Sequence, residues 1–171
     1  MKPQDIVILL KKLTTKGRSL SCRGLAETLG MSPSSVSESL ERSKRAQLVD
    51  RKKQRVNTLA LQEFLLHGIM YVFPVEVGRV VRGMPTYINA SPIKEQITGG
   101  TENYVWRCAQ GTARGQQVEP LYTSVPEAAI QDEELYRLLV IVDTLRIGRT
   151  REKEIAAEEL NKIILRYAEN Q

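Results

Sequence analysis

The chain has 171 residues, a net charge of +5 and an apolar content of 42%, which is enough for a hydrophobic core and excludes a disordered tail. Its apolar runs, such as "IVILL" and "LLVIV", are far shorter than the roughly 20 residues that a membrane-spanning helix needs. The first residues lack the small-residue cleavage site of a secretion signal, so we expect a cytoplasmic protein with no membrane partner.

The charge is distributed unevenly along the chain. Residues 1–60 carry 13 Lys and Arg against 5 Asp and Glu, a net charge of +8. The remaining residues carry 12 against 15, a net charge of −3. A basic first third joined to a mildly acidic remainder indicates a polyanion-binding domain, followed by a second domain that has no need to touch the polyanion.

Three helical patterns occupy the first part of the chain, over residues 3–15, 22–29 and 32–46. In the first two, apolar residues recur every three or four positions. Ser21 is a suitable N-cap for the second helix, and Gly30 suits the left-handed conformation that ends it. Ser32 as N-cap and Pro33 as first helical residue then predict an immediate restart as a third helix.

A basic hairpin and a fourth helix are expected next. The stretch "LVDRKKQRVNTL" alternates weakly between apolar and polar residues around a basic tip, which predicts two short strands. The tip lacks the Asn-Gly or Gly-Gly pair that is typical of tight hairpin turns. A helix over residues 58–72 follows, with Asn57 or Thr58 as its cap.

The sequence changes character after this helix, because residues 74–126 hold 11 of the 18 glycines and prolines. Such a stretch is rich in loops, and it contains two strand-like pieces, "YVWRCA" and "EPLYTSV". Its four aromatic residues indicate that it is folded: Tyr87, Tyr104, Trp106 and Tyr122. Two helices with one apolar stripe each then close the chain, over residues 126–148 and 149–169.

The pattern around Gly30 is typical of a helix-turn-helix. Two helices that cross over a short turn need a small residue at their contact, here Ala26, and a permissive glycine. Apolar residues face inward at Leu25, Leu29, Met31 and Val36. With the phrase "MSPSSVSESLERSKRAQLVDRKKQRVN", the stretch resembles the reading helix and wing of bacterial winged helix-turn-helix regulators, notably MarR-like ones.

The resemblance covers about residues 3–60 and implies a DNA-binding winged helix. Two features depart from the family pattern. Ser39 and Ser43 stand where such helices usually have apolar residues, and the wing lacks its usual glycine. Later phrases, "HGIMYVFP", "RGMPT" and "PLYTSVPEAA", resemble an uncharacterised bacterial family whose members are described as helix-turn-helix proteins.

The third helix is expected to enter the major groove of DNA. Short side chains at its N-terminal end let the backbone approach phosphates and base edges. Arg42 is expected to contact guanine, and Glu38 the amino group of cytosine. Plain capping is the alternative role for the serines, and it does not account for all of them. The contacts predicted in this helix are Ser34, Ser35, Ser37, Glu38, Arg42 and Arg45.

Backbone phosphates are expected to meet two other groups of residues. A charged run is usually plain solvated surface, but "RKKQR" directly follows the reading helix and would lie beside the duplex or reach its minor groove. Its contact residues are Arg51, Lys52, Lys53 and Arg55. Ser21 and Arg23, at the start of the second helix, are natural phosphate contacts.

No catalytic or metal-binding pattern is present in the sequence. Cys22 and Cys108 are far apart and show no zinc or disulfide spacing, and Cys108 is expected to be a buried apolar residue. The single histidine, His67, is expected to be a hydrogen-bonded core residue rather than a ligand. We therefore expect no enzyme, no metal and no cofactor.

These observations predict an α+β fold class, mainly α. Residues 1–73 would form the winged helix-turn-helix domain with its following helix. Residues 74–171 would form a loop-rich segment and two helices that serve dimerisation or hold a small-molecule effector. The expected function is a sequence-specific regulator of transcription, a repressor, that binds double-stranded DNA as a homodimer. The alternative is a protein-interaction module, such as an antitoxin-like autoregulator that binds a partner protein.

Overall fold

The computed structural model describes residues 1–15, 20–53, 55–97 and 102–168. Within these residues the chain forms eight α-helices and three short β-strands, which confirms the expected class, α+β and mainly α. The helices are α1 (Pro3–Thr14), α2 (Cys22–Leu29), α3 (Pro33–Arg45), α4 (Thr58–His67), α5 (Ile69–Val72), α6 (Val125–Gln131), α7 (Glu133–Ile147) and α8 (Thr150–Ala168). The strands are β1 (Val80–Pro85), β2 (Tyr104–Arg107) and β3 (Ala113–Gln117), and two short 3₁₀ turns, Tyr87–Asn89 and Lys94–Gln96, lie between β1 and β2.

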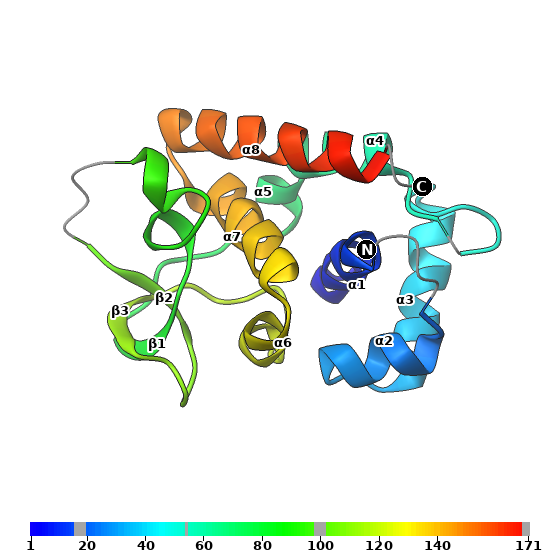
Figure 1. Ribbon diagram of the computed structural model, residues 1–171, viewed down its shortest axis with the longest axis horizontal. Coiled ribbons are helices and arrows are strands. Elements are labelled where there is room, and N and C mark those ends of the chain that lie inside the picture. The colour runs from blue at the N-terminus through cyan, green and yellow to red at the C-terminus, as the bar shows by residue number, and fades with distance from the viewer. Residues whose placement is uncertain (16–19, 54, 98–101, 169–171) are drawn as a thin grey trace.

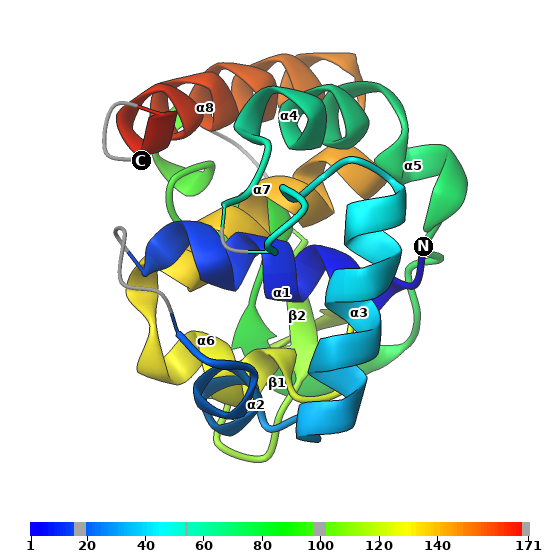
Figure 2. The same ribbon diagram turned by 90° about the vertical axis from the view of Figure 1, so that its right-hand side faces the viewer.

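Helix α7 runs through the middle of the molecule (Figure 1). Every residue from Leu138 to Arg146 is buried, so the helix is enclosed on all sides rather than along one stripe. Helices α1, α5, α6 and α8 all pack against it. The N-terminal unit of α1, α2 and α3 lies at one end of α7 and the small sheet at the other, with α4 and α8 side by side above (Figures 1 and 2).

One polar cluster is buried with α7. The Asp143 carboxylate accepts hydrogen bonds from the Trp106 indole N–H at 2.6 Å and the Thr86 hydroxyl at 2.8 Å. It also pairs with Arg146 Nη1 at 2.7 Å. The same guanidinium donates to the carbonyls of Phe73 and Glu119. Because each buried polar group is satisfied, the cluster fixes the sheet and two connecting segments onto α7.

The three strands close on themselves into a very small barrel. β1 pairs antiparallel with both β2 and β3, and β2 pairs parallel with β3. The closure brings backbones too close for side chains at two glycines. A Cβ atom at Gly83 would lie 1.9 Å from the Trp106 carbonyl oxygen, and one at Gly115 would lie 2.4 Å from that of Asn103.

Several sequence-based expectations need correction. The strand-like piece "YVWRCA" contains β2, but "EPLYTSV" forms turns that lead into α6. The expected helix over residues 58–72 divides at Gly68, and that over residues 126–148 divides at Asp132. The expected hairpin is reduced to a single bridge between Val49 and Val56. The expected helix 149–169 is confirmed as far as Ala168, and Glu169 lies outside the described residues.

The break at Asp132 has a tertiary cause. Its carboxylate accepts the Leu135 backbone N–H at 3.0 Å, which caps α7. The other carboxylate oxygen accepts hydrogen bonds from Lys11 Nζ at 2.8 Å and the Thr14 hydroxyl at 2.9 Å. Two residues of α1 therefore hold this aspartate in an extended conformation between α6 and α7.

The two halves of the chain share one hydrophobic core. It extends from Ile6 and Leu9 on α1, through Leu138 and Val142 on α7, to Leu160 on α8. Residues 1–73 and 74–171, predicted as separate domains, therefore contribute to the same interior. None of the described helices is long and apolar enough to cross a membrane.

We predict that Gly83→Ala destabilises the fold by about 3 kcal/mol or more, the upper range for overpacking, because the new methyl group meets backbone rather than a flexible side chain. Urea unfolding of the full chain measures this change. The matched control is Gly78→Ala, where the new Cβ would be 3.5 Å from its nearest neighbour. Equal stability of the two variants would contradict the tight closure of the barrel.

Candidate nucleic-acid interface

Helices α2 and α3 are joined by a short turn of the predicted kind. Ser21 caps α2 by accepting the Gly24 N–H at 3.1 Å, and Gly30 ends the helix with φ 60° and ψ 38°. Ser32 then caps α3 by accepting the Ser35 N–H at 3.1 Å, and Pro33 opens the helix. The residues predicted to face inward are all buried: Leu25, Ala26, Leu29, Met31 and Val36.

The turn is anchored on the second half of the chain. The Ser124 hydroxyl, just before α6, donates a hydrogen bond to the Leu29 carbonyl, one of the free acceptors at the end of α2. A side chain at Gly30 would meet Ser124, because a Cβ there would lie 3.3 Å from the serine Cβ. This contact fixes where α3 starts.

The outer face of α3 is not covered by another described element (Figure 2). Its inner face packs on α1 and α2 through Val36 and Leu40. The exposed residues along the helix are Ser32, Ser34, Ser37, Glu38 and Arg45, with Ser35, Glu41 and Lys44 half-buried. An uncovered helix of 13 residues is long enough to enter the major groove of B-form DNA.

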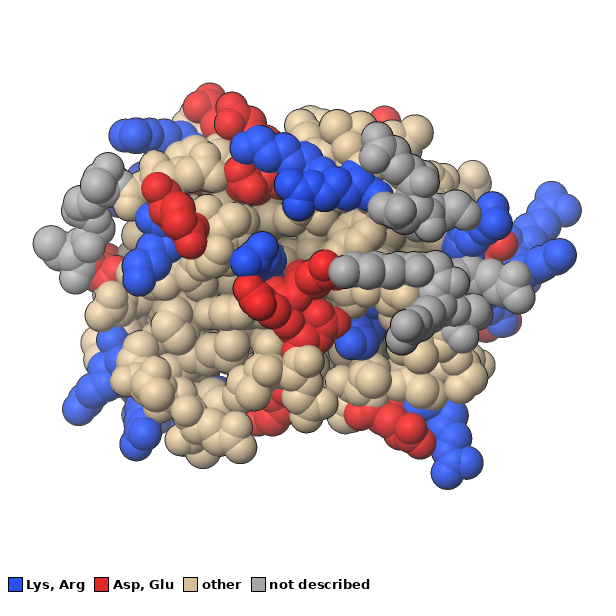
Figure 3. Space-filling view, viewed as in Figure 1, with Lys and Arg blue, Asp and Glu red and all other residues tan. Residues whose placement is uncertain are grey.

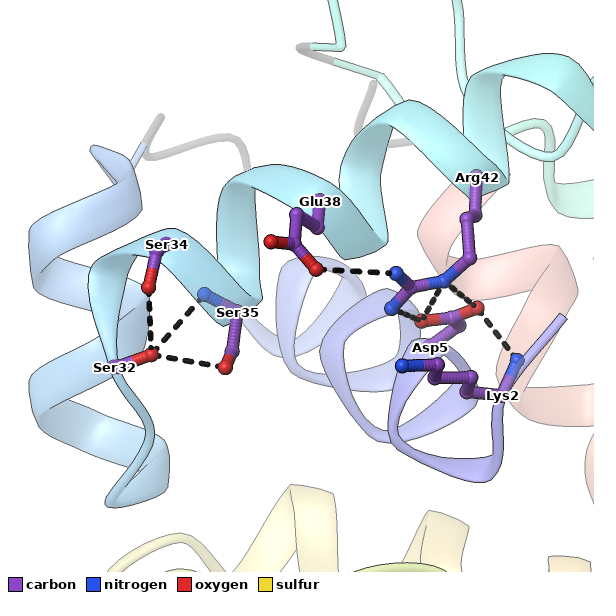
Figure 4. A network of polar contacts seen from close by, with 7 residues as sticks. All are labelled: Lys2, Asp5, Ser32, Ser34, Ser35, Glu38 and Arg42. Carbon is purple, nitrogen blue, oxygen red and sulfur yellow. Dashed lines mark hydrogen bonds and ion pairs between the residues drawn. The ribbon is translucent and has the colours of Figure 1, made fainter.

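The serines at the start of α3 bond mainly to one another (Figure 4). Ser32 Oγ shares a hydrogen bond of 3.0 Å with Ser34 Oγ and donates one of 2.9 Å to Ser35 Oγ. Capping therefore accounts for Ser32, whose hydroxyl also bonds those of Ser34 and Ser35, while Ser37 is exposed and has no described hydrogen bond. These hydroxyls keep the N-terminal turn small, which leaves room for a phosphate or a base edge.

Arg42 points back into the protein rather than outward (Figure 4). Its Nη2 donates to Asp5 Oδ1 at 2.7 Å and its Nε to Asp5 Oδ2 at 3.0 Å. Asp5 is completely buried on α1, and its Oδ2 also accepts the Lys2 backbone N–H at 2.7 Å. Glu38 lies 3.7 Å from the outer nitrogen of the same guanidinium. This bidentate pairing favours a structural role for Arg42 over the predicted contact with guanine.

The pairing also determines the charge state of Asp5. Burial alone would raise the pKa of this carboxyl, but the hydrogen bonds from Arg42 and from the Lys2 backbone outweigh burial. The pKa of Asp5 therefore lies below its ordinary value of 3.8, and the aspartate is ionised at neutral pH. α1 and α3 are held together by a buried ion pair.

Residues 49–53, 55 and 56, called the basic loop below, lie beyond the C-terminal end of α3 (Figures 1 and 2). Its turn is closed by the Asp50 N–H on the Arg55 carbonyl and the Lys53 N–H on the Asp50 carbonyl, both at 2.9 Å. A hollow between the loop and the helix end is lined by Lys44, Gln47, Val49, Asp50, Arg51, Arg55, Val56 and Asn57. Three cations thus face one concave surface beside α3.

The four predicted cations of the basic loop are not equivalent. Arg51, Lys52 and Arg55 are exposed. Lys53 is half-buried and forms an ion pair with Glu41 of α3, and this hydrogen bond lowers the pKa of the glutamate. Lys53 therefore holds the loop against the helix and neutralises a carboxylate that would otherwise repel DNA phosphates.

The structure places the other predicted residues as follows. Ser21 is a helix cap, and Arg23 is exposed and paired with Glu27 at 3.2 Å. Arg45 is exposed at the C-terminal end of α3, and none of the described ion pairs includes it. Sequence reasoning missed Lys44 as part of the hollow and Asp5 as the partner of Arg42. The sequence carried no signal for the latter, because the need of Asp5 for a cation follows from its burial, which only the structure shows.

Lys and Arg gather at the end of the molecule that carries α3 and the basic loop, while the middle of the same face is acidic (Figure 3). Arg107 on β2 and Arg114 on β3 are also exposed, and these strands lie at the opposite end of the molecule (Figure 1). Lys and Arg side chains thus occur on several parts of this face, and the surface beside α3 is one of them.

Trp106, Tyr87 and His67 lie outside this surface. The aromatic rings of Trp106 and Tyr87, expected near an effector pocket, are buried and hydrogen-bonded to Asp143 and Glu152. His67 is exposed at the end of α4, so its expected place in the core is wrong. Among the described residues, no three His, Cys, Asp or Glu side chains are arranged to hold a metal ion.

Comparisons of the chain with protein-family models, with curated proteins and with solved structures find no match in any of the three. Its function is therefore argued from its own geometry.

We predict that Arg42→Ala lowers the free energy of unfolding by about 3–5 kcal/mol, the range for removing one partner of a buried ion pair, because Asp5 stays buried without its cation. Urea unfolding at neutral pH measures the loss. Glu38→Ala is the matched control, since Glu38 is exposed and touches the same guanidinium only at 3.7 Å. A loss as small as that of the control would contradict the structural role.

The Asp5–Arg42 pair also makes the stability lost in Arg42→Ala depend on pH. A carboxyl whose pKa is depressed in the folded state stabilises the fold above its unfolded pKa, and this contribution disappears as the pH falls through the folded pKa. The stability difference between the wild-type chain and Arg42→Ala should therefore be largest at neutral pH and shrink as the solution becomes acidic, because Asp5 is protonated first in the variant and only at lower pH in the wild-type chain. A difference that stays constant into acid would exclude Asp5 as the partner.

We predict that Ser43→Ala stabilises the protein. Ser43 is completely buried on α3, and its hydroxyl has no hydrogen-bond partner among the described residues. Removing an unsatisfied hydroxyl should gain about 1 kcal/mol. Ser37→Ala, on the exposed face, shares only the gain in helix propensity, about 0.5 kcal/mol. Thermal unfolding of both variants separates the two effects, and a loss of stability in Ser43→Ala would show that the hydroxyl is bonded.

Proposed function

We propose that this chain is a sequence-specific regulator of transcription that binds double-stranded DNA through α3 and the basic loop. The observation that carries the proposal is the uncovered outer face of α3 next to three cations of one hollow. A helix in the major groove reads base edges, while adjacent cations hold the backbone phosphates. We propose repression as the mode, because a bound protein blocks access to the duplex without any further contact.

The roles of the residues follow from their environments. Arg51, Lys52 and Arg55 are exposed on the basic loop and contact phosphates. Arg45, rather than Arg42, is the guanidinium that reaches a base, because Arg42 is held by Asp5. Ser34, Ser37 and Glu38 lie on the outer face of α3, where they meet base edges or phosphates.

The competing proposal is a protein-interaction module that binds a partner protein. It gains support from exposed apolar side chains outside α3, four of which lie between Tyr71 and Val80. DNA binding is preferred for the N-terminal unit because its exposed face is polar and basic.

We predict that the purified chain prefers duplex from upstream of its own gene over scrambled duplex by tenfold or more in fluorescence anisotropy. The affinity should fall steeply as the salt concentration rises. Replacing Arg51 and Arg55 together by Ala should lower the salt slope by about 2, since each lost phosphate contact removes about 1. Arg45→Ala should reduce the preference between the two duplexes more than it reduces the salt slope.

The matched control replaces Arg107 and Arg114 by Ala, two exposed arginines on β2 and β3, which lie at the other end of the molecule (Figure 1). This pair should leave both affinity and slope unchanged. If both arginine pairs lower the slope equally, binding is charge-driven and independent of the α3 surface. Absence of binding at low salt would overturn the proposal altogether.

A further inference from the structure

Four of the eight large apolar side chains that are exposed among the described residues lie within ten residues of the chain. They are Tyr71 at 76%, Val72 at 50%, Val77 at 43% and Val80 at 57% exposure. Single apolar residues scattered over a surface need no explanation, whereas these four follow one another along a short exposed segment, as is typical of a segment that binds another protein surface. We call residues 71–80 the apolar edge.

The backbone of the apolar edge is fixed from inside the protein. Arg146 of α7 donates to the Phe73 carbonyl at 3.0 Å. At the other end, the Gly78 N–H donates to the Gln117 carbonyl at 2.8 Å, and the Gln117 N–H to the Arg79 carbonyl at 3.0 Å. The backbone that carries the apolar side chains is therefore already ordered, which reduces the conformational entropy lost on binding.

The apolar edge also carries two opposite charges that are close together in the chain. Glu76 and Arg79 are both exposed, and neither has an ion pair or hydrogen bond of its side chain within the described residues. In a two-fold interface, a residue that meets a second residue of the partner is met in turn by its own counterpart. Glu76 of each copy can thus pair with Arg79 of the other copy.

The position of the apolar edge relative to α3 fits such a pairing. In Figure 2, α3 faces the viewer, and α5 with the segment that follows it lies along the right-hand side of the molecule. Suppose that two copies meet at this right-hand side, related by a two-fold axis that points toward the viewer of Figure 2. Both α3 helices would then face the viewer, on the same side of the dimer. DNA-binding dimers present two reading helices to one face of the duplex in this manner.

We propose that the apolar edge is the contact between two copies of this chain, with Tyr71, Val77 and the Glu76–Arg79 pairs at its centre. The orientation argument rests on the proposed function, whereas the apolar and charge arguments do not. This surface differs from the terminal helices that the sequence analysis considered for dimerisation. On α4 and α8, only Leu59 and Leu165 are large apolar side chains classed as exposed.

We predict that the wild-type chain sediments at twice its 19.3 kDa mass at micromolar concentration. Glu76→Arg and Arg79→Glu should each raise the dimer dissociation constant at least about tenfold, because like charges then face each other. The double variant with both reversals should restore the dimer, which a merely unfolded protein could not do. Tyr71→Ser should weaken the dimer as well.

Glu154→Arg, an exposed reversal on α8, is the matched control and should leave the mass unchanged. A monomeric wild-type chain would overturn the proposal and favour a partner protein as the occupant. A dimer that is insensitive to all apolar-edge variants but weakened by Leu59→Ser or Leu165→Ser would overturn it in favour of the terminal helices. Loss of DNA binding in the Arg51 and Arg55 variant with an intact dimer would separate the two proposals.

Discussion

The buried ion pair between Asp143 and Arg146 is the interaction on which the second half of the chain depends. Its four hydrogen-bonded partners come from the barrel, from the segment after α5 and from the segment after β3. Each of these parts is too small to fold alone, since three strands of four to six residues bury little apolar surface. A charge buried on α7 without its partners would be costly. The pair therefore fixes the barrel and the two connecting segments in one position relative to α7.

A second buried ion pair, between Asp5 and Arg42, fixes the position of α3 relative to the rest of the molecule. Helix α1 packs against α7, and Asp5 of α1 binds the guanidinium of Arg42. Ser124 holds the turn at the other end of α3. The helix is therefore fixed at both ends by side chains from other elements, which suits the base-edge contacts proposed for it. Arg42 points inward and is paired with Asp5, so it does not occupy the outer face of α3.

The two proposed surfaces are fixed by the same helix. The apolar edge is held at the Phe73 carbonyl by Arg146 of α7, and α3 is held through α1, which packs on α7. The distance between the two reading helices of a dimer would therefore be set by packing inside each protomer rather than by a flexible linker. A ligand that shifts α7 would change that distance, which is one physical route by which an effector could act.

The sequence alone determined the local structure of the N-terminal unit, because caps, a left-handed glycine and 3.6-residue periodicity are signals within a few residues of one another. Ser21, Gly30, Ser32 and Pro33 all stand where those signals predict. Only the tertiary structure decided the break at Asp132, the strands β1 and β3 and the direction of Arg42. Each of these depends on a partner far along the chain: Lys11 for Asp132, the neighbouring backbones for Gly83 and Gly115, and Asp5 for Arg42. A side chain that could point outward was turned inward because a buried carboxylate had to be neutralised, and no local pattern records that requirement.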